Sequence, residues 1–403
     1  MHYTKPNIFY YRVAQIASWF VAHFIFRRKV LRNEIKGKKG PFVVIANHQA
    51  MLDFVNLIGL RSKPMSFVIS SSIYNSLPLT RYMDKMGVIP KLQFQTTPKD
   101  MKRMKAVIQH GEALVIYPAG LMCEDGLSTP IPQATYKFLK WLDADVYVAK
   151  TSGTYFVMPK WAKGLRPGRT FMDVYKLFSR EELAALDVET VKQKTDEALL
   201  FDAYREQEQL QVVYRNNANI EGLEHVLYLC PHCVSEFTMQ VKNRDTLFCT
   251  QCGFEHRSDK HGFLHNPSSN GQEARYVSDW SRRIYEHEKA EIQSNPERQL
   301  SCSSKFHMID FKTHKFYEVG HGTLTLCKTH FQIEGVIHGE QTRLQIPIDN
   351  IPTLPFSPGN YLEIQYENDI YRCVLDDGHL VMKFINTIKV FHELHTMDNT
   401  PVV

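Results

Sequence analysis

The chain has 403 residues, enough for two or three domains, and its 43% hydrophobic and 23% charged residues exclude a largely disordered protein. A net charge of +5 over this length is too small to indicate nucleic-acid binding, so no nucleic-acid partner is expected. Four of the eight cysteines form one tight group and no cleavable signal peptide is visible, which favours a reducing cytoplasm over a disulfide framework.

Residues 1–35 are predicted to form an N-terminal membrane-interface helix. The stretch from Ile8 to Phe26 carries apolar residues at helical spacing, but three polar or charged side chains interrupt it: Arg12, Gln15 and His23. A spanning helix needs roughly 20 nearly uninterrupted apolar residues, so a helix lying in the membrane surface is favoured over a transmembrane span. The basic stretch "RRKVLR" that follows suits anionic headgroups. The alternative is a core helix of the first domain whose basic end is merely solvated.

Residues 36–225 are predicted to form an α/β domain. Between about Phe42 and Phe178, short β-rich runs such as "FVVIA", "MSFVIS", "ALVIYP" and "DVYVAK" alternate with helical stretches such as "TPKDMKRMKAVIQHG". This alternation is typical of a mainly parallel sheet flanked by helices. Ser179 and Glu182 have the spacing of a capping box, and polar helices are expected after them.

A histidine and an aspartate follow the run "FVVIA", in the segment "NHQAMLDF". His48 and Asp53 are five residues apart, which on one continuous helix would separate them by about 140°. They can meet only if His48 lies in the turn before a helix and Asp53 about one turn inside it. A carboxylate on one imidazole nitrogen would then leave the other nitrogen free to accept a proton. Because the chain has 18 histidines, such a pair also arises by chance, and a locally bonded histidine with a solvated aspartate is the alternative.

Three blocks in order along the chain strengthen the first interpretation. "NHQAMLD" resembles the NHxxxxD signature of the glycerolipid acyltransferase family, which includes the lysophosphatidic acid acyltransferases. "SLPLTRYMDKMGVIPK" resembles the second block of that family, and "ALVIYPAG" resembles the strand that leads to its Phe-Pro-Glu-Gly block. The resemblance covers roughly residues 41–155.

The resemblance implies acyl transfer from acyl-CoA or acyl-carrier protein to the hydroxyl of a lysolipid, with 1-acylglycerol-3-phosphate as the leading acceptor. His48 would be the general base and Asp53 the residue that orients it. The predicted substrate-binding residues are Asn47, Lys91, Arg81, Tyr117, Pro118 and Gly120. No Gly-x-Ser-x-Gly elbow occurs, which argues against a serine lipase.

The sequence also departs from the family pattern. The glutamate of the third block is Ala119, and the Thr-Arg-Ser that commonly follows is Leu121, Met122 and Cys123. The arginine of the second block falls at Gln93, and Lys91, two residues earlier, would project from the same face of a strand. These changes leave the His48–Asp53 pair intact but put the identity of the acyl acceptor in question, so another lysolipid or a glycolipid is the alternative.

Residues 226–262 resemble a zinc ribbon. Two CxxC knuckles, Cys230 with Cys233 and Cys249 with Cys252, are separated by 15 residues. Four thiolates at this spacing predict a tetrahedral Zn²⁺ site, and a closed four-cysteine site is structural because it leaves no open position for catalysis. A linker and a charged helix are expected over residues 263–300.

Residues 301–403 are predicted to form a β-rich domain closed by a helix, in an order that resembles a pleckstrin-homology-like barrel. Two classes of function remain open. The first is an acyltransferase bound peripherally or monotopically to the cytoplasmic face of a membrane with anionic lipids. The second is a scaffold that keeps the fold without turnover and docks through its ribbon.

Overall fold

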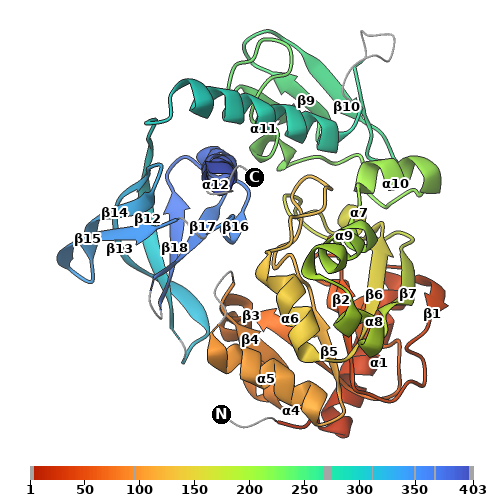
Figure 1. Ribbon diagram of the computed structural model, residues 1–403. Helices are drawn as coiled ribbons and strands as arrows, with labels where there is room; N and C mark the ends of the chain where they lie inside the picture. Colours follow the sequence, from red (N-terminus) through yellow and green to blue (C-terminus); the bar gives the residue numbers. More distant parts are fainter. Residues whose placement is uncertain are drawn as a thin grey trace. The chain divides into compact units, whose positions relative to one another are not determined.

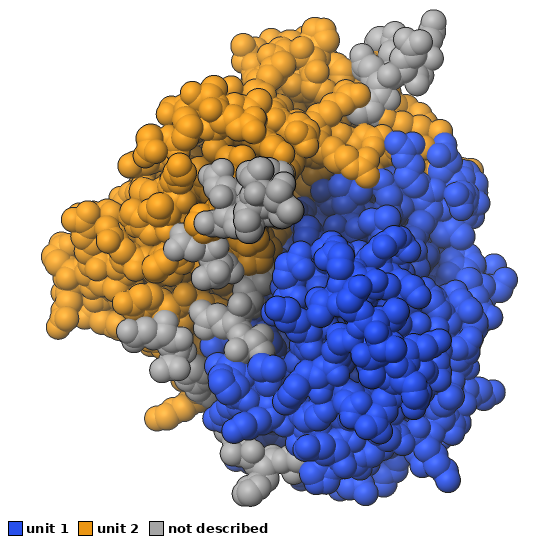
Figure 2. All heavy atoms as spheres, viewed as in Figure 1, with its two compact units in different colours: residues 1–160, 164–217 blue, residues 161–163, 218–403 orange. Residues whose placement is uncertain are grey.

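The computed structural model describes residues 4–93, 97–266, 275–310, 312–348, 351–366 and 369–398. The chain divides into two compact units, residues 1–160 with 164–217 and residues 161–163 with 218–403 (Figures 1 and 2). Each unit is described by itself. The finer boundaries expected from the sequence, at 35, 225, 262 and 300, stay predictions.

Unit 1 alternates strands and helices, as the sequence pattern predicts. Its strands are β1 (Lys29–Asn33), β2 (Phe42–Ala46), β3 (Met65–Ser70), β4 (Ile89–Lys91), β5 (Ala113–Ile116), β6 (Asp145–Ser152) and β7 (Phe171–Phe178). Its helices are α1 (Ile8–Phe24), α2 (Asp53–Ile58), α3 (Ser71–Ser76), α4 (Thr80–Lys85), α5 (Pro98–Gln109), α6 (Ala134–Leu142), α7 (Thr154–Val157), α8 (Arg180–Ala185), α9 (Val188–Leu199) and α10 (Ala203–Leu210). The predicted capping box is present, because Ser179 and Glu182 exchange side-chain and backbone hydrogen bonds at the start of α8.

The seven strands of unit 1 form one sheet in the order β1-β7-β6-β2-β5-β3-β4. β6 and β7 pair antiparallel, whereas the other neighbours run parallel. This arrangement confirms the expected α/β class with a mainly parallel sheet. Because β2, β3, β4, β5 and β6 point the same way, the segments that follow them emerge at one edge of the sheet, where α/β proteins commonly bind ligands.

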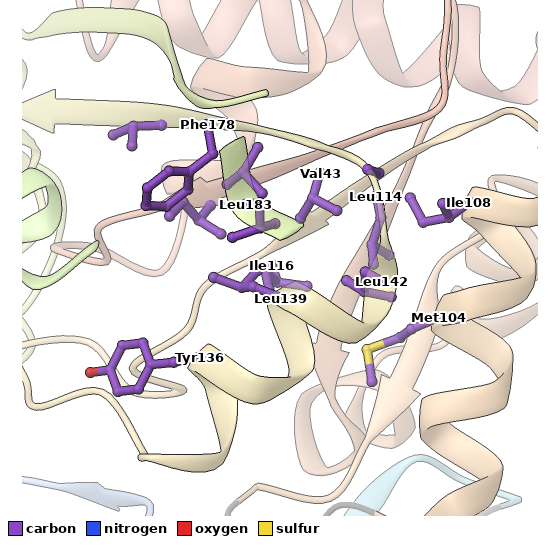
Figure 3. Packing of buried hydrophobic residues seen from close by; sticks show 14 of the residues in the cluster. Val43, Met104, Ile108, Leu114, Ile116, Tyr136, Leu139, Leu142, Phe178 and Leu183 are labelled. Carbon is purple, nitrogen blue, oxygen red and sulfur yellow. The ribbon is translucent and has the colours of Figure 1, made fainter. Parts of the chain in front are cut away.

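Strand β2 is buried on both faces, so alternate side chains enter two different cores. Val43 and Ile45 pack with α5, α6, α8 and α9 on one face (Figure 3). Phe42 and Val44 pack with α1 and α2 on the other. The sheet is thereby covered by helices on both sides, which fixes the positions of the loops at its carboxyl edge.

Helix α1 turns its apolar face outward. Tyr11, Ser18 and Ala22 are its buried residues, whereas seven large apolar side chains are exposed: Ile8, Phe9, Val13, Ile16, Trp19, Phe20 and Phe24. Helical periodicity therefore predicted the helix correctly. Tyr11 packs in the core, as the alternative of a core helix expects, whereas the apolar face is exposed. No helix of the described residues is both long and apolar enough to cross a bilayer.

Unit 2 begins with the short 3₁₀ turn η1 (Leu223–His225) and a four-stranded sheet in the order β11-β10-β9-β8. These strands are β8 (Met239–Lys242), β9 (Thr246–Cys249), β10 (Glu255–Ser258) and β11 (Leu264–His265). The charged helix expected from the sequence is α11 (Val277–Ser294).

The rest of unit 2 is an antiparallel seven-stranded sheet in the order β15-β14-β13-β12-β18-β17-β16, followed by helix α12 (Leu380–Asp398). Its strands are β12 (Leu300–Asp310), β13 (Lys315–Leu326), β14 (His330–Ile337), β15 (Glu340–Pro347), β16 (Phe356–Ser357), β17 (Tyr361–Tyr366) and β18 (Asp369–Leu375). The predicted antiparallel β-domain with a C-terminal helix is confirmed, while its likeness to a pleckstrin-homology domain stays a prediction.

Candidate active site and metal centre

His48 and Asp53 lie together at the carboxyl edge of the unit 1 sheet. His48 follows β2 by two residues and Asp53 opens α2, so the histidine precedes the helix as the spacing requires. Nδ1 of His48 lies 3.0 Å from Oδ2 of Asp53. Asp53 is the first residue of α2 rather than one turn inside it, because the residues between His48 and Asp53 form turns instead of helix.

Oδ2 of Asp53 also accepts two backbone hydrogen bonds, from the N–H groups of Gln49 at 2.7 Å and Ala50 at 2.9 Å. The carboxylate is fully buried, whereas 20% of the His48 side chain is exposed. Asp53 therefore holds both the imidazole and the loop that carries it. With Nδ1 directed at the carboxylate, Nε2 is the nitrogen that can take a proton from a bound hydroxyl.

Two buried amides anchor this loop to the end of β6. Asn47 donates to the carbonyl of Thr151 at 2.8 Å and accepts from its N–H at 2.8 Å. Gln49 donates to the same carbonyl at 3.1 Å and accepts from the hydroxyl of Thr154 and the N–H of Tyr155. The structure thus places Asn47 in the support of the loop. Its predicted role toward substrate stays a prediction, and Gln49 is a supporting residue that the sequence pattern did not single out.

The third sequence block follows β5 and lies beside the pair. The ring of Tyr117 packs on the ring of His48 at 4.5 Å between centroids. Tyr117, Pro118, Ala119 and Gly120 form a turn in which the Gly120 N–H donates to the Tyr117 carbonyl at 3.0 Å. Gly120 has a φ of +72°, a conformation that glycine adopts without strain. Because the Gly120 N–H closes this turn, the donor is already hydrogen-bonded within the protein.

Gln93 occupies the position of the expected arginine and bonds within the protein. Its amide donates to the Gly120 carbonyl at 2.6 Å and accepts from the hydroxyl of Ser70, at the end of β3, at 3.2 Å. Gln93 lies beyond the end of β4, so the expectation that Lys91 and Gln93 share one face of a strand is wrong. The side chain instead ties the ends of β3 and β5 together.

The two predicted cations of the second block lie in different surroundings. Lys91 ends β4, and its Nζ donates to the Leu92 carbonyl at 3.0 Å. Burial lowers the pKa of Lys91, although the nearby Asp100 partly offsets the effect. Arg81 is exposed on α4. Lys91 is thus the partly buried cation, and Arg81 has the surroundings of a solvated one.

The four predicted cysteine ligands converge in unit 2. Their sulfur atoms all lie within 4.8 Å of one another, with Cys230 and Cys252 at 3.7 Å and Cys233 and Cys249 at 3.7 Å. A disulfide would need about 2.05 Å between sulfurs, so these are separate thiols. A tetrahedron with metal–sulfur distances of about 2.3 Å has edges of about 3.8 Å, which the two distances match.

The pKa is lowered for two of the four thiols, Cys233 and Cys249, whereas burial raises the pKa of Cys230. At Cys249 burial opposes ionisation, but hydrogen bonds with the Thr238 side chain and with the backbone of Cys252 and Gln251 lower its pKa. Gly253 follows the second knuckle with a φ of +74°, as a tight knuckle turn requires. The cluster is able to bind a metal ion, and four sulfurs would complete a closed tetrahedron.

Comparisons with known proteins bear on unit 1. Residues 27–157 match the family model described as Acyltransferase. No curated protein matches the chain. A solved structure, the 1-acyl-sn-glycerophosphate (LPA) acyltransferase PlsC from Thermotoga maritima, is 16% identical, with a TM-score of 0.41 over 50% of this chain and 78% of that one. The matched segment contains β2, the His48–Asp53 pair and the turn at Gly120, and this part of the chain is similar to the Acyltransferase family.

Proposed function

We propose that this protein transfers a fatty acyl group from a thioester to the free hydroxyl of a lysolipid, with His48 as the general base. The observation that carries the proposal is the hydrogen bond between His48 Nδ1 and the buried Asp53 carboxylate at the carboxyl edge of the sheet. A carboxylate in this position fixes the tautomer of the imidazole and stabilises the imidazolium that forms when Nε2 accepts a proton.

The reaction needs no acyl-enzyme. The lysolipid hydroxyl oxygen attacks the thioester carbonyl carbon while its proton passes to Nε2 of His48. The tetrahedral intermediate then collapses, the carbon–sulfur bond breaks, and the imidazolium returns the proton to the departing thiolate. Cys123 lies close to the pair, but its burial raises the pKa of its thiol, as do the charges of Asp125 and Glu124. Cys123 therefore remains a protonated thiol and is unsuited to act as a nucleophile.

The acceptor we propose is 1-acylglycerol-3-phosphate, which would give phosphatidic acid. Lys91 is the candidate for binding its phosphate, because a partly buried ammonium interacts more strongly with an anion than a solvated one does. The bonded amide of Gln93 and the apolar Ala119 favour a second candidate, a lysolipid or glycolipid that carries no phosphate at this position. The donor is acyl-CoA or acyl-carrier protein.

We further propose that unit 1 docks on the cytoplasmic face of a membrane through α1. The exposed apolar side chains of this helix form a surface that suits insertion among lipid headgroups. The surface extends to the α3–α4 connection, where Leu77 and Leu79 are exposed, and to α4, where the exposed Tyr82 contacts Tyr10 at 5.0 Å between ring centroids. This second segment was not anticipated from the sequence.

The basic stretch after α1 contributes less than the sequence suggests. Arg27 and Lys29 are exposed and remain available to anionic headgroups. Arg28 donates to the Asn56 carbonyl, and Arg32 forms hydrogen bonds of 2.7 and 2.9 Å with Asp173. We therefore expect the apolar face to supply most of the membrane affinity, with electrostatic attraction adding a smaller share.

For the four-cysteine cluster we propose a structural Zn²⁺. Zinc is the metal that four thiolates in a tetrahedron most commonly bind, and such a site leaves no position for a substrate. Metal analysis of the purified protein and of a Cys230→Ser, Cys249→Ser variant tests this: about one zinc per chain, lost in the variant, is expected.

The test of the function is a matrix of donors and acceptors. Purified protein is incubated with vesicles that contain lysophosphatidic acid, a neutral monoacylglycerol or a lysoglycolipid, each with an acyl-CoA or an acyl-carrier-protein thioester. Mass spectrometry is expected to detect phosphatidic acid with at least one donor. A product only from a phosphate-free acceptor would select the second candidate. No acylated lipid from any combination would reject the enzyme in favour of a non-catalytic scaffold.

A further inference from the structure

The Tyr117 hydroxyl beside the His48–Asp53 pair and the Oδ1 atom of Asp53 are buried without a hydrogen-bond partner among the described residues. Oδ2 of Asp53 accepts three hydrogen bonds, whereas its Oδ1 has no protein partner among the described residues. The same holds for the Tyr117 hydroxyl. Buried polar groups are nearly always hydrogen-bonded, because a buried group left without a partner destabilises the folded state.

Tyr117 and Asp53 interact electrostatically. Burial raises the pKa of Tyr117 well above its ordinary value, and the charge of Asp53 raises it further. The phenol therefore stays protonated and remains a donor. Its ring is fixed against the His48 ring at 4.5 Å between centroids, so the hydroxyl cannot turn away without disturbing the imidazole.

The amide of Asn56 is a third buried polar group without a protein partner among the described residues. Asn56 lies on α2 three residues after Asp53, and side chains at this spacing share one face of a helix. Asn56 is buried, and both polar atoms of its amide have no protein partner among the described residues. A buried water molecule makes about three hydrogen bonds, so a donor such as the Tyr117 hydroxyl and an acceptor such as Oδ1 of Asp53 are groups that it can satisfy.

We propose that Tyr117 is a positioning residue whose hydroxyl bonds through a buried water to Oδ1 of Asp53 and holds the carboxylate against His48. The proposal rests on the proposed function, because its catalytic consequence requires His48 to act as a base. A carboxylate held at both oxygens cannot rotate, so the donor and acceptor of the His48–Asp53 bond stay aligned when the imidazole takes the proton. Tyr117 does not touch the reacting atoms.

The test is Tyr117→Phe, which removes only the hydroxyl. We expect kcat to fall about fivefold, equivalent to about 1 kcal/mol, with KM unchanged, because the substrate contacts remain while the support of the base is weakened. The low-field proton resonance of the His48–Asp53 hydrogen bond, assigned by its loss in His48→Ala, is expected to shift in Tyr117→Phe. This signal does not depend on turnover.

The matched control is Tyr147→Phe. Tyr147 lies on β6 in the core on the same face of the sheet, and its buried hydroxyl also has no protein partner among the described residues. This variant should leave kcat and the low-field resonance unchanged. If Tyr117→Phe behaves in the same way, the proposal is overturned. If the wild type shows no turnover but the resonance shifts only in Tyr117→Phe, the hydrogen-bond network stands and the proposed function fails.

Discussion

At the residue scale, Asp53 has a structural role and a proposed electrostatic role, which substitutions can separate. Its Oδ2 accepts hydrogen bonds from the backbone of Gln49 and Ala50 and so shapes the loop, and in the proposed mechanism its charge stabilises the imidazolium of His48. In Asp53→Asn, the amide oxygen can take the place of Oδ2 and keep all three bonds. This variant should fold normally and lose roughly a hundredfold in kcat, because the negative charge is removed while the acceptor at the Oδ2 position is kept.

Asp53→Ala provides the comparison. It removes both the charge and the acceptor for two backbone N–H groups, so it should also lower the free energy of unfolding by about 1–2 kcal/mol. Denaturant melts and kcat measured on both variants check this. An Asp53→Asn enzyme with wild-type turnover would show that the carboxylate has no electrostatic role.

The backbone at Val234, in the first cysteine knuckle, has a strained conformation. Val234 follows Cys233 with a φ of +58°, a conformation that is strained for a β-branched residue. Gly253, which follows Cys252 in the second knuckle, has a similar φ of +74°. Val234→Gly should therefore stabilise unit 2 by about 1 kcal/mol, measured as a higher resistance to thermal or chelator-induced unfolding.

The reciprocal change is the control for this prediction. A Cβ at Gly253 would meet no atom within 4 Å, so Gly253→Val adds backbone strain without a steric clash. It should destabilise the unit by a similar amount. Equal stability of both variants and the wild type would show that the knuckle backbone stores no strain.

At the scale of elements, strands were the most predictable part of the chain. The runs "FVVIA" and "MSFVIS" coincide with β2 and β3, because a short β-rich run between turn residues leaves few alternatives. Helix α2 was harder to predict. The spacing placed Asp53 about one turn inside the helix, but the carboxylate of Asp53 accepts hydrogen bonds from the N–H groups of Gln49 and Ala50 in a turn, and the helix begins only at Asp53.

The meeting of His48 and Asp53 was predictable from the sequence, whereas the contacts around them were not. The spacing required His48 to precede the helix, and the structure meets this part of the condition with a bond of 3.0 Å, although Asp53 is the first residue of α2 rather than one turn inside it. The bonds of Gln93 to Ser70 and Gly120 join three separate strand ends. Such contacts depend on the order of strands in the sheet, which periodicity along one segment does not encode.

The surroundings of helix α1 could not be predicted from its sequence periodicity either. Periodicity identifies its apolar face but cannot tell whether that face is buried in protein or exposed. Phe9 and Phe20 are 66% and 51% exposed. Changing both to serine should lower binding to anionic vesicles roughly a hundredfold, because each phenylalanine contributes roughly 1.5 kcal/mol when it leaves water. Vesicle co-sedimentation measures the effect.

The control for α1 uses exposed apolar residues elsewhere in unit 1. Leu165→Ser and Leu200→Ser remove comparable exposed side chains outside this helix and should leave vesicle binding unchanged. If the α1 variant binds as tightly as the wild type, the interfacial role of the helix is wrong.

At the scale of the whole molecule, the cysteine cluster is linked to the end of the chain within unit 2. Lys383 on α12 forms ion pairs with Glu236, which follows the first knuckle, and at 3.6 Å with Glu288 on α11. Glu288 also accepts a hydrogen bond from Thr387 at 2.7 Å. Lys383 and Glu288 are almost completely buried, so loss of one partner would leave an uncompensated charge.

Removal of the proposed Zn²⁺ should therefore destabilise more than the knuckles. With a chelator, hydrogen exchange is expected to accelerate in β8 to β10 and also in α11 and α12, while β2 and β5 of unit 1 keep their protection. Acceleration confined to the knuckles would show that the buried ion pairs do not couple the ribbon to the two helices.

The central claim is that His48 abstracts a proton during acyl transfer, and thiol release from an acyl thioester in the presence of a lysolipid measures it most directly. His48→Ala should reduce kcat at least about a hundredfold while folding and metal content are preserved. His110→Ala is the matched control, since His110 precedes β5 and lies away from the carboxyl edge of the sheet. Its turnover should equal that of the wild type. Acceptor-dependent turnover by His48→Ala at the wild-type rate would contradict the account.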